Sequence, residues 1–309
     1  MRKRAYGKTG TSVSEIGFGA WQLGNAKDWG NMQTADAIAL VHAAIDLGCN
    51  FFDTAPGYGK SEAILGEALK DRRHEVVINT KVGHTADGTS DFSPVGIRNS
   101  VLSSLKRLGT DYLDSVLLHN PAKELMDGDS PQFNMLRSLK QEGLIGAYGL
   151  SIDTAHEMLH VIENTDTEVM EILFNIFHQD TRDAFTAAQN NSIALIVKVP
   201  LDSGWLSGKY HANSQFEGIR KRWSQADVQR RAELVEDIRF IEKPGVSLTQ
   251  SALQFILAHQ EISTVIPGIK NIEQLHENLG AATEIMPEHI VAQLHDFWER
   301  ELKTNPVPW

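Results

Sequence analysis

The sequence predicts an α/β fold, a (β/α)8 TIM barrel with an N-terminal hairpin and extra C-terminal helices. Segments with strand-like and helical patterns alternate along the chain, and eight of them are strand-like. Strict alternation favours parallel strands, and eight such strands favour closure into a barrel. The length of 309 residues suits a barrel of roughly 250 residues with added loops and helices. No linker-like shift in composition divides the chain, so we expect one domain over residues 1–309.

The first half of the chain predicts the hairpin and four strands. Residues 5–13 suit a hairpin with its turn at 7–10, where two glycines occur. Thr34 and Gly48 are suitable cap residues for the first long helix. The predicted strands are 14–18, 50–53, 76–80 and 113–118, and the predicted helices are 35–47, 63–69 and 94–108.

The second half repeats the alternation. The predicted strands are 146–150, 169–174, 193–197 and 263–266. The predicted helices are 132–141, 154–163, 180–189, 225–242, 247–259, 272–281 and 288–302. The last helix has no strand before it, so it is an addition to the eightfold pattern.

Composition narrows the class of partner. With 40 acidic and 29 basic residues, the formal charge of −11 disfavours nucleic acid, because phosphate contacts need a basic surface. The basic N-terminus is followed by no apolar run, and no stretch has the roughly 18 apolar residues of a membrane helix. The single cysteine, Cys49, is compatible with a reducing compartment. We therefore expect a cytoplasmic protein with a small-molecule partner; the sequence leaves the oligomeric state open.

The stretch FFDTAPGYG at 51–59 has the character of a functional site. Asp53 ends an apolar segment, and Tyr58 follows between Gly57 and Gly59. Glycines let the backbone turn sharply and approach a ligand, so Tyr58 can lie at the rim of a cleft.

Three polar residues are predicted to share one mouth of the barrel. Asp53, Lys81 and His119 lie at the carboxyl ends of the second, third and fourth strands. Active sites of TIM barrels lie at this end, and Tyr58 would lie over it from the following loop. Taken singly, each residue also has a structural interpretation, as a turn cap, a loop aromatic, a surface charge or a hydrogen-bonded strand-end histidine.

Together these four residues suit proton transfer to a carbonyl oxygen. A phenol with a pKa near 10 needs a nearby cation to give up its proton, and Lys81 can be that cation. Asp53 can hold Lys81 by an ion pair, while His119 can hydrogen-bond a substrate oxygen beside Tyr58. No side chain can supply a hydride, so the reaction needs a further partner.

Several motifs resemble those of the aldo-keto reductase family, in order and over nearly the whole chain. They are GFGAWQLG at 17–24, FFDTAPGYGKSEAILGEAL at 51–69, TKVG at 80–83, LLHN at 117–120, GLS at 149–151, PLDSGWLSGKY at 200–210 and IPGIKNIEQLHENL at 266–279. The resemblance implies a (β/α)8 barrel that binds NADP(H) in an extended form, which agrees with the absence of a G-x-G-x-x-G motif after a strand. It also implies Tyr58 as general acid, Lys81 and Asp53 as groups that tune it, and His119 as the group that orients the carbonyl.

The resemblance further implies which residues bind the cofactor and the substrate. Ser151 would hold the nicotinamide amide, residues 201–204 with Lys209 would border the pyrophosphate, and Lys270 would bind a 2′-phosphate. Lys270 favours NADP(H), although NAD(H) stays open. The substrate pocket would include Trp21, Tyr58 and His119. The full cofactor set is Gly19, Ala20, Trp21, Asp53, Ser151, Glu171, Lys198, Leu201, Asp202, Ser203, Gly204, Lys209, Gly268, Lys270, Gln274, Glu277 and Asn278.

Three positions depart from the family pattern near the nicotinamide. Ile152 stands where relatives often have Asn or Arg, Glu171 where they usually have Gln, and Lys198 where they have an aromatic residue that stacks on the ring. Two interpretations of Lys198 are open. It lies beside the cofactor or substrate, or it pairs with Glu171 across the barrel.

Two functional hypotheses follow from the resemblance. The first is an oxidoreductase that transfers a hydride between NADP(H) and a carbonyl or alcohol substrate, with Tyr58 as general acid or base. The second is a cofactor-sensing regulatory subunit similar to potassium-channel β subunits, which carry Asn where this chain has His119. The identity of the carbonyl or alcohol and the direction of reaction are not predicted.

Two other motifs have competing interpretations. Residues 156–160 form an H-E-x-x-H motif, a spacing typical of zinc proteases. The apolar positions of this helix would pack on the barrel and leave His156, His160 and Glu163 toward solvent, so we expect no metal site. These positions are Ala155, Met158, Leu159 and Ile162. The basic residues 220–222 beside Trp223 either close over an anionic cofactor or form a solvated loop.

Overall fold

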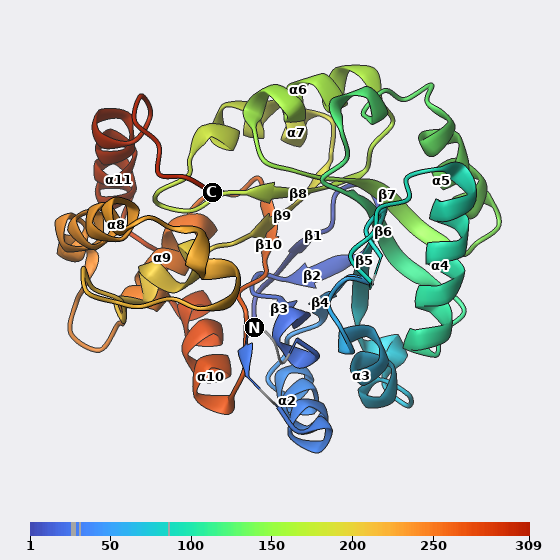
Figure 1. The fold of residues 1–309 in the computed structure, drawn as a ribbon, viewed down its shortest axis with the longest axis horizontal. Helices are drawn as coiled ribbons and strands as arrows, with labels where there is room; N and C mark the ends of the chain where they lie inside the picture. Colours follow the sequence, from blue (N-terminus) through green and yellow to red (C-terminus); the bar gives the residue numbers. More distant parts are fainter. Residues whose placement is uncertain (26–28, 31, 86) are drawn as a thin grey trace.

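The computed structural model describes residues 1–25, 29–30, 32–85 and 87–309. Eight parallel strands form one sheet in the order β10-β9-β8-β7-β6-β5-β4-β3, so neighbours in the sheet are neighbours in the chain. Helices surround these strands (Figure 1). The predicted (β/α)8 architecture is confirmed. The strands are β3 (Phe18–Gly19), β4 (Phe51–Asp53), β5 (Val77–Val82), β6 (Leu113–His119), β7 (Ile145–Ile152), β8 (Val169–Leu173), β9 (Ala194–Lys198) and β10 (Ile262–Val265).

The first and last strands meet and close the ring. Parallel bridges join Ile16 to Val265 and Gly19 to Gly268. The amide of Gly17 donates to the carbonyl of Val265 at 2.8 Å. The first strand was expected at 14–18, but Ser14 pairs with Lys3 in the hairpin instead, so the barrel strand begins later, at Phe18.

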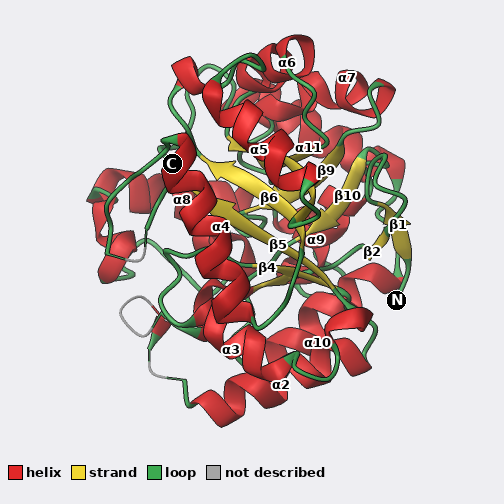
Figure 2. Ribbon diagram, turned by 90° about the vertical axis from the view of Figure 1, so that its right-hand side faces the viewer, coloured by secondary structure: helices red, strands yellow, loops and turns green. Residues whose placement is uncertain are grey.

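The predicted N-terminal hairpin is present, with its strands shifted outward from 5–13. Strand β1 (Lys3–Ala5) pairs antiparallel with β2 (Ser12–Ser14). Tyr6 and Val13 pack with Phe51, Val77 and other interior residues at the amino ends of the barrel strands. The hairpin and the C-terminus lie on opposite sides of the molecule (Figure 2). The hairpin therefore closes one end of the barrel and leaves the other end for a site.

The helices largely follow the prediction. Helix α4 (Pro94–Leu108) begins where Ser93 accepts from the amide of Gly96 and ends before Gly109, whose φ of 62° favours glycine. The other long helices are α2 (Thr34–Asp46), α3 (Ser61–Ala68), α5 (Pro131–Gln141), α6 (Ala155–Asn164), α8 (Gln225–Asp237), α9 (Leu248–Leu257), α10 (Ile272–Gly280) and α11 (Glu288–Glu301).

Two predicted helices are shorter than expected. The segment expected at 180–189 is a 3-10 turn, Asp180–Ala184, followed by the short α7 (Phe185–Asn190). The segment expected at 225–242 stops at Asp237, and a separate 3-10 turn covers Arg239–Ile241. Within the described part of the chain, none of the helices has the length and apolar character needed to span a bilayer.

The alternation of side chains along each strand determines which residues enter the barrel. Phe51 packs in the interior cluster with Tyr6, whereas Phe52 packs with residues that face the helices. A period of two then directs Asp53 inward, two residues after Phe51. The same period of two directs Lys81 and His119 inward, because Val77 and Leu117 on the same strands belong to the interior cluster. Consecutive strands thus bring three polar side chains to the carboxyl end of the barrel.

Candidate active site

Asp53 and Lys81 form a buried ion pair at the carboxyl ends of β4 and β5. The Lys81 ammonium donates to the two carboxylate oxygens of Asp53 at 2.6 and 2.7 Å. It also donates to the carbonyl of Thr54 at 3.3 Å. The side-chain amide of Asn79 donates to Oδ2 of Asp53 at 2.7 Å. The predicted pair is therefore formed, and the hydrogen bonds that Asp53 accepts from Lys81 and Asn79 stabilise its charged form.

A second carboxylate shares the same ammonium. Oε2 of Glu171, on β8, lies 3.0 Å from Nζ of Lys81. Lys198 does not pair with Glu171, because its ammonium forms an ion pair with Asp153 at 2.8 Å and donates to Oγ of Ser151, also at 2.8 Å. Of the two interpretations of Lys198, the pair across the barrel with Glu171 is excluded.

Tyr58 and His119 lie beside this cluster. The ring centroids of Tyr58 and His119 are 6.2 Å apart, and Nζ of Lys81 lies 5.3 Å from the Tyr58 ring centroid. The Trp21 ring lies 6.0 Å from that of Tyr58. The structure thus brings together the four predicted catalytic residues and the aromatic residue predicted for the pocket wall.

The charges of the cluster follow from burial and from the neighbours. Burial would lower the pKa of Lys81, but the carboxylates of Asp53 and Glu171 outweigh it and hold this pKa above its usual value. Burial and then Glu171 raise the pKa of Asp53 to about 7, against the opposing effects of Lys81 and Asn79. Burial also raises the pKa of Tyr58, and Lys81 only partly offsets this. Tyr58 is therefore a protonated donor at neutral pH.

His119 is a neutral imidazole. Burial lowers its pKa to about 2, with further effects from Lys81, Lys198 and His84. A neutral imidazole carries one N–H donor, so His119 can hydrogen-bond a carbonyl oxygen without bringing a positive charge.

A cavity of about 650 Å³ opens directly at these residues. It is lined by Asp53, Tyr58 and His119, while Lys81 is fully buried behind them. The predicted cofactor residues that also line it are Gly19, Trp21, Glu171, Lys198, Leu201, Ser203, Gly204, Lys209, Gly268, Gln274, Glu277 and Asn278. A volume of this size is typical of a small-molecule or cofactor site.

Four predicted cofactor residues do not line this cavity. Ala20 and Ser151 are fully buried, and Ser151 is hydrogen-bonded to Lys198. Asp202 is also buried, where it accepts from Arg231 at 2.9 Å. Lys270 lies in an adjoining hollow that shares Gln22 with the cavity. Lys270 remains close to the site, because its amide donates to Oε1 of Gln274 at 3.1 Å.

Eleven lining residues lie outside the predicted set of site residues, and five of them have a charged side chain, an aromatic ring or a long side-chain amide. Arg220 is only 8 % exposed, donates to the carbonyl of Ser203 at 3.0 Å and stacks 4.2 Å from the Trp29 ring. The sequence shows the basic residues 220–222, but it does not predict that Arg220 lines the cavity. The remaining side chains, Gln22 and the terminal Trp309, have no distinctive sequence pattern. The five residues are Gln22, Trp29, Arg220, Arg222 and Trp309.

Aromatic contacts connect the catalytic residues with the basic loop. Trp21 contacts Tyr58 on one side and Trp29 on the other, with ring centroids 6.0 and 5.5 Å apart. Trp29 in turn contacts Arg220. The cavity thus joins a proton-donating end to an end that carries Arg220, Arg222 and Lys209.

The cavity contains unsatisfied polar atoms that suit a polar ligand. Among the described residues, Oε1 of Gln22 and Nε1 of Trp29 are buried without a hydrogen-bond partner, and Oε2 of Glu171 has its ion pair with Lys81 but accepts no well-formed hydrogen bond. All three side chains line the cavity. Buried polar atoms normally have partners, so these atoms indicate a ligand with donors and acceptors of its own. With the cations of the basic loop, they fit a long anionic cofactor.

Residues of the H-E-x-x-H segment make structural contacts on α6. Glu157 forms a capping box with Thr154 at the start of α6, and Nε2 of His160 lies 2.9 Å from Asp127. Leu159 was expected to pack on the barrel, but it is 37 % exposed because Ala155, Met158 and Val161 form the buried face. Among the described residues, no group of three His, Cys, Asp or Glu side chains is placed to hold a metal.

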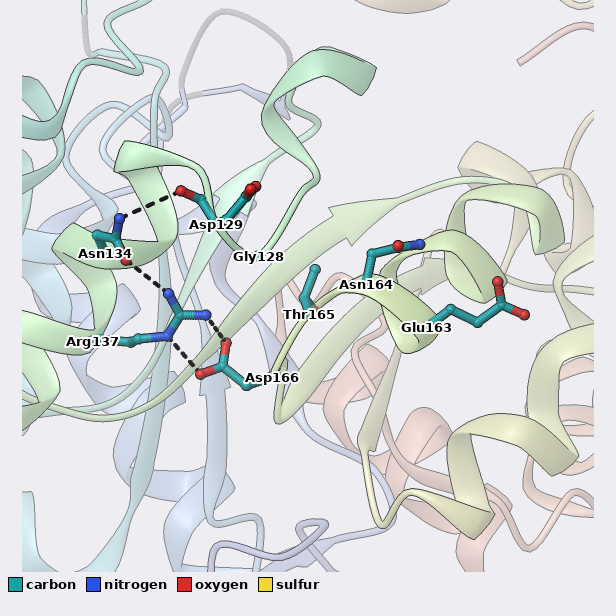
Figure 3. Close-up of a pocket in the computed structure, with 8 residues that line it drawn as sticks. All are labelled: Gly128, Asp129, Asn134, Arg137, Glu163, Asn164, Thr165 and Asp166. Carbon is teal, nitrogen blue, oxygen red and sulfur yellow. Dashed lines mark hydrogen bonds and ion pairs between the residues drawn. The ribbon is translucent and has the colours of Figure 1, made fainter.

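A second hollow lies on the outer surface, between α5 and α6 (Figure 3). Among the described residues that line it, Arg137 is the one basic side chain, and its guanidinium forms two hydrogen bonds of 2.7 Å with Asp166. It also donates to Asn134 at 2.9 Å. Because this cation is already paired, the hollow lacks the free charge that an anion site needs.

Comparison with known proteins agrees with this geometry. The model of the aldo/keto reductase family matches residues 15–299. The chain belongs to the aldo/keto reductase family. It is therefore a member of a family of oxidoreductases that act on small-molecule carbonyl substrates.

Relatives of this aldo/keto reductase include enzymes and a channel subunit. L-galactose dehydrogenase of Arabidopsis thaliana is 32 % identical over 91 % of this chain and 88 % of its own length. A probable voltage-gated potassium channel β subunit of Oryza sativa is 30 % identical over 93 % and 92 %. The holo form of aldo-keto reductase AKR11C1 from Bacillus halodurans superimposes with a TM-score of 0.80, at 25 % identity and 96 % coverage of both chains.

Proposed function

We propose that this protein is an NADP(H)-dependent enzyme that interconverts a carbonyl compound and an alcohol. The observation that carries the proposal is the convergence of Tyr58, His119 and the buried Lys81 on one cavity. A bound nicotinamide supplies or accepts the hydride that no side chain can provide. The family and the cavity support a nicotinamide cofactor.

Each residue of the site has a role that follows from its charge. Tyr58 holds a proton for the carbonyl oxygen, because burial keeps its phenol protonated. Lys81 lies beside the ring and stabilises negative charge that develops on the phenol oxygen. Neutral His119 donates to the same substrate oxygen and orients it. Asp53 positions Lys81, which it contacts through both oxygens.

The preference for NADP(H) rests on the basic residues near the cavity. Arg220, Arg222 and Lys209 line it and suit the phosphates of either dinucleotide. Lys270 is the candidate for the 2′-phosphate, because it lies next to Gln274 at the edge of the cavity. Replacing Lys270 with Ala should weaken NADPH binding more than NADH binding.

The test is Tyr58→Phe. The variant should bind the cofactor as the wild type does and lose turnover roughly 100- to 10,000-fold, since general acid catalysis is worth about that much. NADPH and NADH oxidation is followed over a panel of sugar, pyridoxal, small aldehyde and ketone substrates. Unchanged turnover in the variant would refute the role of Tyr58. Tight cofactor binding by the wild type without turnover of any compound would favour the regulatory-subunit hypothesis.

A further inference from the structure

The polar cluster under the cavity carries more negative than positive charge. Lys81 is enclosed with two carboxylates, and Asp53, Lys81 and Glu171 are exposed by only 2, 0 and 2 %. The other ammonium nearby, Lys198, is matched by Asp153 at 2.8 Å. When both carboxylates of the cluster are ionised, one negative charge is in excess. An uncompensated buried charge is costly and favours a positive partner.

Glu171 is the member of the cluster that can interact with a ligand in the cavity. Asp53 accepts from Lys81 and from Asn79 through well-formed hydrogen bonds. Oε2 of Glu171 lies near Lys81, yet it has no hydrogen-bond partner among the residues that the structure describes. Glu171 also lines the cavity. The excess charge and the unsatisfied oxygen therefore coincide at one side chain.

We infer that Glu171 makes the site bind the oxidised nicotinamide more tightly than the reduced one. The oxidised ring is a cation and the reduced ring is neutral, so only the oxidised form compensates the excess negative charge. The inference rests on the proposed function.

The experiment compares the affinities of the two redox forms. Dissociation constants for NADP⁺ and NADPH are measured by calorimetry at pH 8 for the wild type and for Glu171→Gln, which keeps the size of the side chain. The ratio of the NADP⁺ constant to the NADPH constant should rise roughly tenfold in the variant, equal to about 1.4 kcal/mol. The same ratio in both proteins would overturn the inference.

Glu277→Gln is the matched control. Glu277 lines the same cavity, but it accepts from Ser247 at 2.7 Å and belongs to the set expected at the adenosine half. Removing its charge should change both affinities together and leave their ratio as in the wild type. If Glu277→Gln changed this ratio as much as Glu171→Gln does, removal of any carboxylate in the cavity would have the same effect on the ratio. That result would overturn the inference.

A measurement on the wild type tests the inference without a variant. Around Glu171, Lys81 stays charged, and Tyr58 and His119 stay neutral near pH 7, while Lys198 keeps its ion pair with Asp153. The group left to titrate between pH 6 and 8 is Asp53, whose carboxyl has a pKa of about 7. The preference for NADP⁺ should therefore be larger at pH 8 than at pH 6. A preference that is equal at both pH values contradicts the inference.

The two possible failures are distinguishable. If neither NADP⁺ nor NADPH binds to the wild type, the proposed function fails. If both bind and Tyr58→Phe abolishes turnover, but the ratio is the same in Glu171→Gln and at both pH values, the inference alone fails.

Discussion

The hydroxyl of Tyr6 lies 2.7 Å from the hydroxyl of Ser115, and this contact connects the N-terminal hairpin to the active site. Ser115 donates to Oδ1 of Asn79 at 2.6 Å, so its single proton is used and Tyr6 must be the donor to Ser115. Asn79 then donates to Asp53. Every donor in this buried chain points toward the carboxylate of Asp53.

Removing the first hydroxyl should destabilise the fold. In Tyr6→Phe the buried Ser115 loses its donor, and the free energy of unfolding should fall by about 1 kcal/mol. Urea denaturation measures this loss. Tyr112→Phe is the control, because Tyr112 is 41 % exposed and its change should stay within about 0.5 kcal/mol. Equal losses in the two variants would contradict the role of the buried chain.

Asn79→Ala should alter the pH dependence of the site. Burial and Glu171 raise the pKa of Asp53 to about 7 even though the hydrogen bond from Asn79 lowers it. Without it the pKa of Asp53 should rise, so the carboxyl stays neutral to a higher pH. The pH at which NADP⁺ binding strengthens should therefore move upward, as calorimetry between pH 5 and 9 would show. A profile that coincides with that of the wild type would count against this role.

His119 should not titrate in the ordinary working range. Burial and the nearby Lys81 and Lys198 ammoniums lower the pKa of its imidazole to about 2, so the neutral form persists at all higher pH values. Nitrogen NMR of the labelled protein should show one signal pattern for this ring from pH 5 to 9. Protonation of His119 near pH 6.5 would disagree with its buried position.

Arg220 should contribute to cofactor affinity, and Lys221 should not. Arg220 is almost fully buried against Trp29 and lines the cavity, whereas the adjacent Lys221 is exposed. A hydrogen bond to a charged group is worth about 1.5–3 kcal/mol. Arg220→Ala should therefore weaken NADPH binding more than tenfold, and fluorescence titration would show it. Lys221→Ala tests whether a charge anywhere in the loop suffices; a similar loss there would refute the specific contact.

The alternation of strands and helices, together with the polar residues at the strand ends, made much of the site predictable. Asp53, Lys81 and His119 each end a recognisable β-strand, and parallel neighbours in a barrel necessarily bring such residues to one mouth. Tyr58 was predictable from the glycines around it. The aldo/keto reductase motifs then supplied the remaining cofactor positions, most of which line the cavity.

Contacts across the barrel were not predictable in this way. The ion pair between Lys81 and Glu171 joins β5 to β8. Nothing in the local sequence of these strands indicates that Glu171 pairs with Lys81 and not with Lys198. Arg220 and Trp309 reach the cavity from a long loop and from the end of the chain, where no periodic pattern fixes the path. The first strand was misplaced because its short pairing gives little pattern to recognise.

The junction between the first and last strands of the barrel borders the cavity. The first and last strands are joined near the mouth by a bridge between Gly19 and Gly268, and both glycines line the cavity. A molecule that fills this space touches both sides of the junction at once. It would hold the first and last strands together, so that binding of the molecule and closure of the barrel stabilise each other.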